Sequence, residues 1–255
     1  MLLAEVEQHR SQLSQVTTLA ASDITAYARA VMNESPEDVA GQVREASAAI
    51  VGTYSGVAAE GAALFYEGQR PQAGAPVEIA PPSIGERLAA DLGYALAPLF
   101  TPEAFGSPGQ TFLSRLAGAV SLHTAAGDRQ TMMLTSAADP LSGGVRRFAR
   151  AGACAFCAYL STVEATVYDD TVWHTDCTCV NVPWWEDNPL PDADYMDRFA
   201  DAAEKARADI LADYREKRKL APDLRLRNFH RQFPETAVNT KNIAARMRAE
   251  MGLAH

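Results

Sequence analysis

The amino-acid sequence predicts a mostly helical protein of the α+β class, in which two helical parts flank a small cysteine-rich module with strands. Alanine, the strongest helix former, supplies 47 of the 255 residues, whereas aromatic residues make up only 8%. Apolar residues recur at helical spacing over most of the chain. The four cysteines, by contrast, all lie between Cys154 and Cys179, beside clusters of β-favouring residues.

Four helices are expected in the N-terminal part. They cover residues 2–33, 36–69, 84–99 and 108–137. The first should be interrupted near residues 21–23, where the apolar rhythm weakens. The second has the clearest start, because Ser35 is a favourable N-cap and a proline follows it. Gly52, Gly56 and Gly61 inside this helix would each cost about 1 kcal/mol relative to alanine, so another helix is expected to approach closely there.

The rest of the chain changes in kind and then returns to helix. Strands are expected over residues 166–168, 171–173 and 178–182. Helical periodicity resumes over residues 195–220 and again over 239–251, where Gly252 should close the last helix. The predicted domains are a helical domain over 1–144, a strand-and-knuckle module over 145–190, and a helical C-terminal extension with a basic segment over 191–255.

Charge and hydropathy exclude several classes of protein. The formal net charge is −9, so the protein is not expected to coat nucleic acid with its whole surface. No window holds 18 consecutive apolar residues, which argues against a transmembrane helix. The N-terminus lacks the basic region of a signal peptide and an A-x-A cleavage site after an apolar core. We therefore expect neither a membrane protein nor a secreted one.

The cysteines and one histidine form a spaced motif that is typical of small zinc sites. It reads Cys154-x2-Cys157, sixteen residues, then His174-x2-Cys177-x-Cys179. Two short pairs of thiolate or imidazole ligands, brought together by a returning hairpin, can close a tetrahedron around Zn²⁺. Five candidates compete for four places: the repeated x2 spacing favours the first four, and Cys179 can replace either of the last two. The alternatives are disulfides or buried free thiols.

The sequence does not predict an enzyme. A catalytic zinc site needs an open position, whereas five ligand-type side chains here favour a closed structural site. The zinc deaminase pattern is absent, because His174 follows the CxxC and no H-x-E precedes it. Nucleotide-binding, nucleophile-elbow and HExxH motifs are also missing. His9 and His123 are isolated in the sequence and suggest no site.

Charge is segregated near the C-terminus. Residues 164–201 contain ten acidic side chains and a single basic one. A dense basic run follows, made up of Arg215, Lys217, Arg218, Lys219, Arg225, Arg227 and Arg231. The run is either a solvated helix face or a patch that binds phosphate or an acidic protein partner.

The segment GACAFCAYLSTVEATVYDDTVWHTDCTCVNVP resembles the MuF-like minor capsid, or head morphogenesis, proteins of tailed phages, particularly those of actinobacteriophages. The resemblance rests on the CxxC, a short hydrophobic stretch, and a His-x-x-Cys-x-Cys that ends in a Val/Pro run. It is strong over about 40 residues and looser over about 200. The common actinophage form has His-x-His-Cys, whereas here Val172 and Thr175-Asp176 occupy that neighbourhood.

This resemblance implies a structural role in the virion. Such proteins are low-copy components inside the phage head, bound near the portal, and linked to DNA packaging or ejection. It implies the portal protein as a partner, with the major capsid protein and packaged DNA as further candidates, and no membrane or small-molecule substrate. The protein would be made in the host cytoplasm. The alternatives are a zinc-stabilised nucleic-acid-binding protein and, third, a metalloenzyme.

Overall fold

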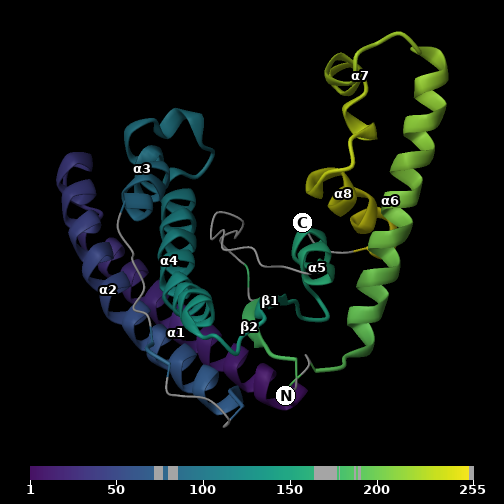
Figure 1. The fold of residues 1–255 in the computed structure, drawn as a ribbon. Helices are drawn as coiled ribbons and strands as arrows, with labels where there is room; N and C mark the ends of the chain where they lie inside the picture. The colour runs from purple at the N-terminus through teal and green to yellow at the C-terminus, as the bar shows by residue number, and fades with distance from the viewer. Residues whose placement is uncertain are drawn as a thin grey trace. The chain divides into compact units, whose positions relative to one another are not determined.

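The computed structural model describes residues 1–71, 77–79, 86–163, 177, 179–186, 188 and 191–252. In this part of the chain it contains eight α-helices and one two-stranded sheet, so the prediction of a mostly helical protein is confirmed (Figure 1). The chain divides into two compact units, the first built on the four N-terminal helices and the second on the short helix that begins at the CxxC together with the C-terminal helices.

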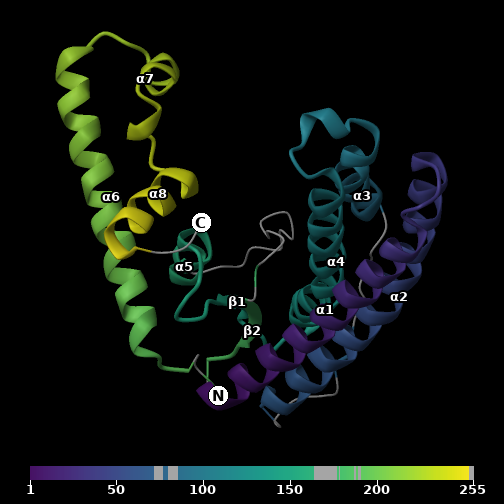
Figure 2. The same cartoon turned by 180° about the vertical axis from the view of Figure 1, so that it is seen from behind.

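The first unit is a bundle of long helices. Its elements are α1 (Leu3–Val31), α2 (Pro36–Gln69), α3 (Glu86–Phe100), the 3₁₀ turn η1 (Pro102–Ala104) and α4 (Pro108–Ala138). Helix α4 packs against α1, α2 and α3, and α1 also packs against α2 (Figures 1 and 2). The core of this bundle contains both small and larger apolar side chains. Its members include Ala20, Ile24, Val39, Val43, Leu92, Leu96, Phe112 and Leu116.

The ends of these helices follow the sequence closely, with one correction. The Ser35 hydroxyl accepts a hydrogen bond from the backbone N–H of Asp38 at 3.2 Å, as expected of an N-cap. The predicted interruption of the first helix near residues 21–23 is wrong, because α1 is continuous. Ala20 and Ile24 are fully buried on its inner face, whereas Ser22 and Asp23 are exposed. The polar residues therefore mark the solvent face of an unbroken helix.

A close helix approach exists, but the glycines of α2 do not make it. No described atom of another element lies within 4 Å of the Cβ position at Gly52, Gly56 or Gly61. The close contact is instead made by Gly127 of α4, where a Cβ would lie 2.2 Å from the backbone oxygen of Ser55. The predicted approach at the α2 glycines is therefore wrong, and the α2–α4 crossing depends on a glycine of the other helix.

Helix α2 is long and apolar enough, by length and composition, to cross a membrane. An 18-residue window within it has a mean hydropathy of 1.3, although only 22% of that window is buried. Core helices of soluble proteins meet the same criterion, and nine residues of α2 are buried in this structure. Polar residues interrupt the apolar ones in α2, so no unbroken apolar run of 18 residues marks this helix in the sequence. The absence of a membrane partner stays a prediction.

A buried polar contact joins the end of α2 to the end of α4. Asp139, which caps α4, accepts hydrogen bonds from Arg70 Nε at 2.7 Å and Arg70 Nη2 at 3.0 Å, and from the Tyr66 hydroxyl at 2.9 Å. The Arg70 hydrogen bonds lower the pKa of Asp139 to about 2, helped by the backbone N–H of Leu141. Burial raises the pKa of Tyr66. The carboxylate is therefore charged and nearly saturated with donors.

The described sheet consists of β1 (Gly144–Phe148) and β2 (Val180–Trp184). The predicted strand over 178–182 overlaps β2, and the strands over 166–168 and 171–173 lie outside the described residues. β1 was not predicted. The start of β1 requires two glycines. A Cβ at Gly143 would lie 1.9 Å from the Trp184 ring, and Gly144 has a φ of 119°, which favours glycine.

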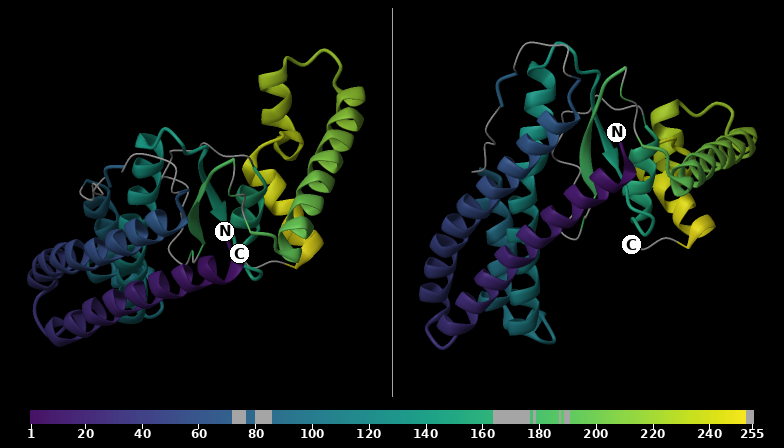
Figure 3. Two further views of the ribbon diagram at one scale, coloured as in Figure 1. Left: turned by 60° about the horizontal axis from the view of Figure 1, so that its bottom comes forward. Right: turned by 90° about the horizontal axis from the view of Figure 1, so that it is seen from below.

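The second unit is also helical. Its elements are α5 (Ala155–Thr162), α6 (Asp194–Leu220), α7 (Leu226–Gln232), the 3₁₀ turn η3 (Pro234–Thr236) and α8 (Thr240–Met251). Helices α5, α6 and α8 pack against one another (Figures 1 and 3). Gly252 ends α8 in the left-handed conformation, as predicted. Helix α7 was not predicted; its buried Phe229 contacts Tyr214 and Phe233.

The contacts group the described residues from 146 to 163 with the C-terminal helices. The sequence predicts that they belong to a separate module over 145–190. The three-domain division stays a prediction.

Candidate metal centre

The cysteine motif begins at the N-terminus of α5. Cys154 is the N-cap residue, and its Sγ accepts a hydrogen bond from the backbone N–H of Cys157 at 3.4 Å. The x2 spacing therefore places Cys157 in the first turn of the helix, where it is only 1% exposed. The four cysteines, all of them described, form no disulfide.

Three thiols of the motif come together. The Sγ atoms of Cys157, Cys177 and Cys179 all lie within 4.8 Å of one another. Ligands of a tetrahedral zinc with Zn–S bonds of about 2.3 Å are separated by about 3.8 Å, so a small contraction would bring the three thiols to bonding distance. Cys157 and Cys179 are buried and Cys177 is partly buried, as in a closed structural site. The residues present therefore fit a thiophilic metal such as zinc.

Two residues of the motif are candidates for the fourth ligand, Cys154 and His174. Cys154 is not in the cluster of three, although its thiol is next to the first turn of α5. His174 lies outside the described residues. The cluster contains Cys179, which the repeated x2 spacing ranked as a replacement ligand, as well as the favoured Cys157 and Cys177. That the ligands come from Cys154, Cys157, His174, Cys177 and Cys179 stays a prediction.

Two buried arginines contact the cysteines, and one of them, Arg147, lies just before the CxxC in the sequence. Arg147 of β1 is buried, and its Nη1 lies 3.8 Å from Cys157 Sγ, where a positive charge favours the thiolate form. Arg129 of α4 is 2% exposed, and its Nη2 donates to the backbone oxygen of Cys177 at 2.8 Å. The Asn181 side chain in turn donates to the backbone oxygen of Arg129 at 3.4 Å. Such contacts orient ligand-bearing backbone.

In the structure, some side chains of the basic segment contact other parts of the second unit, and the others are exposed. Arg218 donates to the backbone oxygens of Ala221 and Leu224, and its guanidinium lies 5.3 Å from the centre of the Phe229 ring. Lys217 lies 5.6 Å from the Phe233 ring centre. These two side chains help to hold α7 against the end of α6. The exposed members of the segment are Arg215, Lys219, Arg225, Arg227 and Arg231.

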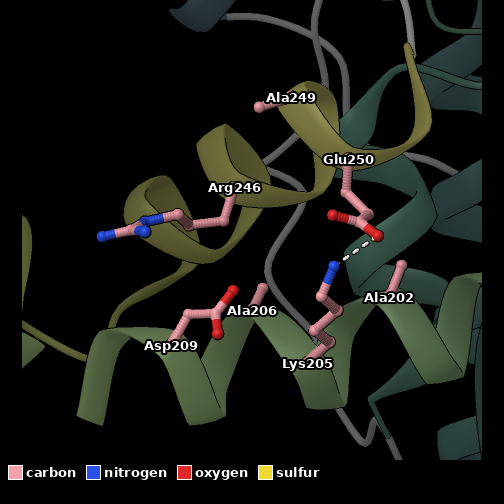
Figure 4. Close-up of a pocket in the computed structure, with 7 residues that line it drawn as sticks. All are labelled: Ala202, Lys205, Ala206, Asp209, Arg246, Ala249 and Glu250. Atoms are coloured by element: carbon pink, nitrogen blue, oxygen red, sulfur yellow. Dashed lines mark ion pairs between the residues drawn. The ribbon is translucent and has the colours of Figure 1, made fainter. Parts of the chain in front are cut away.

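A cavity between α6 and α8 is lined by side chains of both charges and by alanines. The cavity has a volume of about 200 Å³, and Lys205 Nζ lies 2.5 Å from Glu250 Oε1. Figure 4 shows this ion pair together with the other residues that line the cavity. Arg246 pairs with Asp213. The partners of both pairs are between 38% and 55% exposed, so each pair contributes little stability. The other lining residues include Ala202, Ala206 and Ala249, and we assign no function to this cavity.

Comparison with known proteins identifies one family. The sequence model of the VG15 protein family matches residues 3–206, which is most of the chain and includes both the helical bundle and the cysteine motif. No curated protein and no solved structure matches the chain. VG15 is a phage-associated family, which indicates a phage-encoded protein and leaves the MuF-like type as a proposal. The chain therefore belongs to the VG15 protein family.

Proposed function

We propose that the protein is a minor capsid protein of a tailed phage, which acts in head morphogenesis inside the head and close to the portal. The observation that carries this proposal is the cluster of Cys157, Cys177 and Cys179, because these residues also carry the resemblance to MuF-like proteins. Membership of a phage-associated family over residues 3–206 supports a role in the phage particle. The protein would support assembly and DNA packaging or ejection.

Zinc would act in this protein as a folding staple. When bound by thiolates, the metal supplies folding free energy to a segment that has little apolar surface of its own to bury. Cys157 is on α5 and Cys179 directly precedes β2, so ligation would tie the start of this helix to the start of this strand. Arg147 would favour the thiolate that the metal needs. A closed thiolate site is structural, and we propose no enzymatic activity.

The exposed arginines of the basic segment would bind the portal protein. Arg225, Arg227 and Arg231 are exposed on or next to α7, and Arg215 is exposed on α6. An acidic surface is the partner that such a set recognises. The same side chains favour the second candidate, a zinc-stabilised nucleic-acid-binding protein, in which they would bind phosphates.

The test counts copies of the protein in phage particles. Phage would carry Arg225→Gln, Arg227→Gln and Arg231→Gln together, and the matched control would carry Lys241→Gln, an exposed cation of α8. We expect the wild-type protein to be in purified heads and to co-purify with the portal. The triple variant should reduce its copy number at least threefold, and the control should not.

Three outcomes separate the candidates. Absence of the protein from purified heads would overturn the virion assignment. Normal copy number and DNA delivery in the triple variant would remove the basic segment from the mechanism. Tight DNA binding by the isolated protein, with an affinity that falls steeply with salt and with the triple substitution, would favour the nucleic-acid-binding alternative.

A further inference from the structure

A cavity of about 280 Å³ lies between α1 and α2 in the first unit, with α4 beneath it. Its walls are mostly apolar and include Leu13, Val57 and Leu64. Val57 is 49% exposed and Leu64 is 71% exposed, although both are large aliphatic residues. The volume is just below the ~300 Å³ at which pockets for drug-sized ligands begin, so it suits a group of a few heavy atoms.

A buried histidine and a buried aspartate belong to this cavity. His9 of α1 is 3% exposed and Asp128 of α4 is 0% exposed, and both line the cavity. His9 Nε2 lies 2.8 Å from Asp128 Oδ2. The Phe65 ring stacks on the imidazole with a centroid distance of 4.4 Å, which fixes the plane of His9.

The carboxylate of Asp128 is short of hydrogen-bond donors. Among the described residues, neither of its oxygens has a partner with hydrogen-bond geometry, because the short contact with His9 Nε2 does not have that geometry. Buried carboxylates normally accept several hydrogen bonds, as Asp139 does at the other end of α4. Asp128 therefore has unused capacity to accept hydrogen bonds.

The chemistry of the cavity selects a cationic donor. Asp128 lies at its floor, Glu60 is exposed at its mouth, and the charged residues lining it include no lysine or arginine. An anion would meet two carboxylates, whereas a neutral apolar group would leave the Asp128 oxygens without a donor. An ammonium or guanidinium group on an alkyl stem places N–H donors at the floor and methylene groups against Leu13, Val57 and Leu64.

We propose that this cavity is a binding site for an alkylammonium or alkylguanidinium group, with Asp128 as the acceptor at its floor and Glu60 as a second negative charge at its mouth. The group would come either from a free alkylamine or from a lysine or arginine side chain of a partner protein. The proposal does not depend on the metal centre or on the basic segment.

The site can be tested by NMR titration of the whole protein. The probes are 1,4-diaminobutane, n-butylguanidinium and the capped tripeptide acetyl-Ala-Arg-Ala-amide, and the controls are n-butanol and butyrate. The ring C–H signals of His9, assigned with a His9→Gln variant, report on binding. We expect saturable shifts with the cationic probes and none with the alcohol or the anion.

Three variants make the outcome decisive. Asp128→Asn should weaken binding at least tenfold. Glu60→Gln should weaken binding about twofold to threefold, and Leu64→Trp should block the mouth of the cavity. Both positions are exposed, so these two variants should fold even if Asp128→Asn fails to fold. Binding of the tripeptide but not the diamine identifies a partner side chain as the source, and the reverse identifies a free amine. No saturable shift with any cationic probe, or shifts unchanged in Leu64→Trp, would overturn the proposal.

Discussion

Asp139→Asn is the substitution that most directly tests how the helical bundle is held together. Asn has nearly the same shape as Asp but carries no charge, so the change removes electrostatic stabilisation without leaving a cavity. In the native protein the Asp139 side chain is 0% exposed and the Arg70 side chain is 11% exposed. The substitution therefore leaves a largely buried guanidinium without its countercharge.

The expected loss can be estimated from these contacts. Breaking a buried ion pair by removing one partner costs about 3–5 kcal/mol. Arg70 keeps some access to water, and the new side chain can still accept one hydrogen bond, so the lower end, about 3 kcal/mol, applies. For a chain of this size, that loss lowers Tm on the order of 10 °C.

The pH dependence provides an independent check of the same contact. Because the pKa of Asp139 is lowered from 3.8 to about 2 in the folded protein, its charge stabilises the fold fully above about pH 4, and this stabilisation is lost as pH falls through 2. A shift of this size corresponds to about 2 kcal/mol. The difference in stability between wild type and Asp139→Asn should therefore be largest near neutral pH and shrink towards pH 2.

Urea unfolding followed by circular dichroism measures these quantities. The matched control is Asp23→Asn, because Asp23 also accepts a hydrogen bond from a tyrosine, Tyr54 at 2.6 Å, but on the exposed surface. The control should change the free energy of unfolding by no more than about 0.5 kcal/mol. If Asp139→Asn and Asp23→Asn have equal effects, or if the Asp139→Asn effect does not depend on pH, the reasoning about the buried contact is wrong.

Two further predictions concern helix packing and the metal. Gly127→Ala should destabilise the protein by about 3 kcal/mol, because the new methyl group would meet the Ser55 backbone oxygen, whereas Gly56→Ala on the open face of α2 should be neutral or stabilise by up to about 1 kcal/mol in thermal unfolding. Cys154→Ser separates capping from ligation, since serine is a good N-cap and a poor zinc ligand. Elemental analysis of protein purified under reducing conditions should find about one zinc per wild-type chain. Loss of zinc in Cys154→Ser with α5 intact would make Cys154 the fourth ligand, whereas retained zinc would point to His174. A wild-type protein without metal would refute the zinc proposal.

Local signals in the sequence determined most of the helices. The Ser35 cap, the apolar stripes and the terminal Gly252 each act within a few residues, so they predict helix ends without knowledge of the fold. The cysteine motif likewise predicted that thiols would come together, but its spacing did not decide which ones, because Cys157 meets Cys177 from twenty positions away whereas its near neighbour Cys154 is not in the cluster. The predicted break at residues 21–23 is wrong, since a polar turn on the solvent face of a long helix looks the same in the sequence as a break.

Only the tertiary structure decided which residues meet across long separations. Arg129 and Cys177 are 48 positions apart, and Tyr66 and Asp139 are 73 apart, so no local pattern links them. The sequence placed the close helix crossing at the α2 glycines, but packing placed it at Gly127, because the rotation of each helix depends on all of its neighbours. His9 appeared isolated for the same reason. Asp128 faces it only because α1 and α4 pack side by side, and burial of that pair is a property of the bundle rather than of either segment.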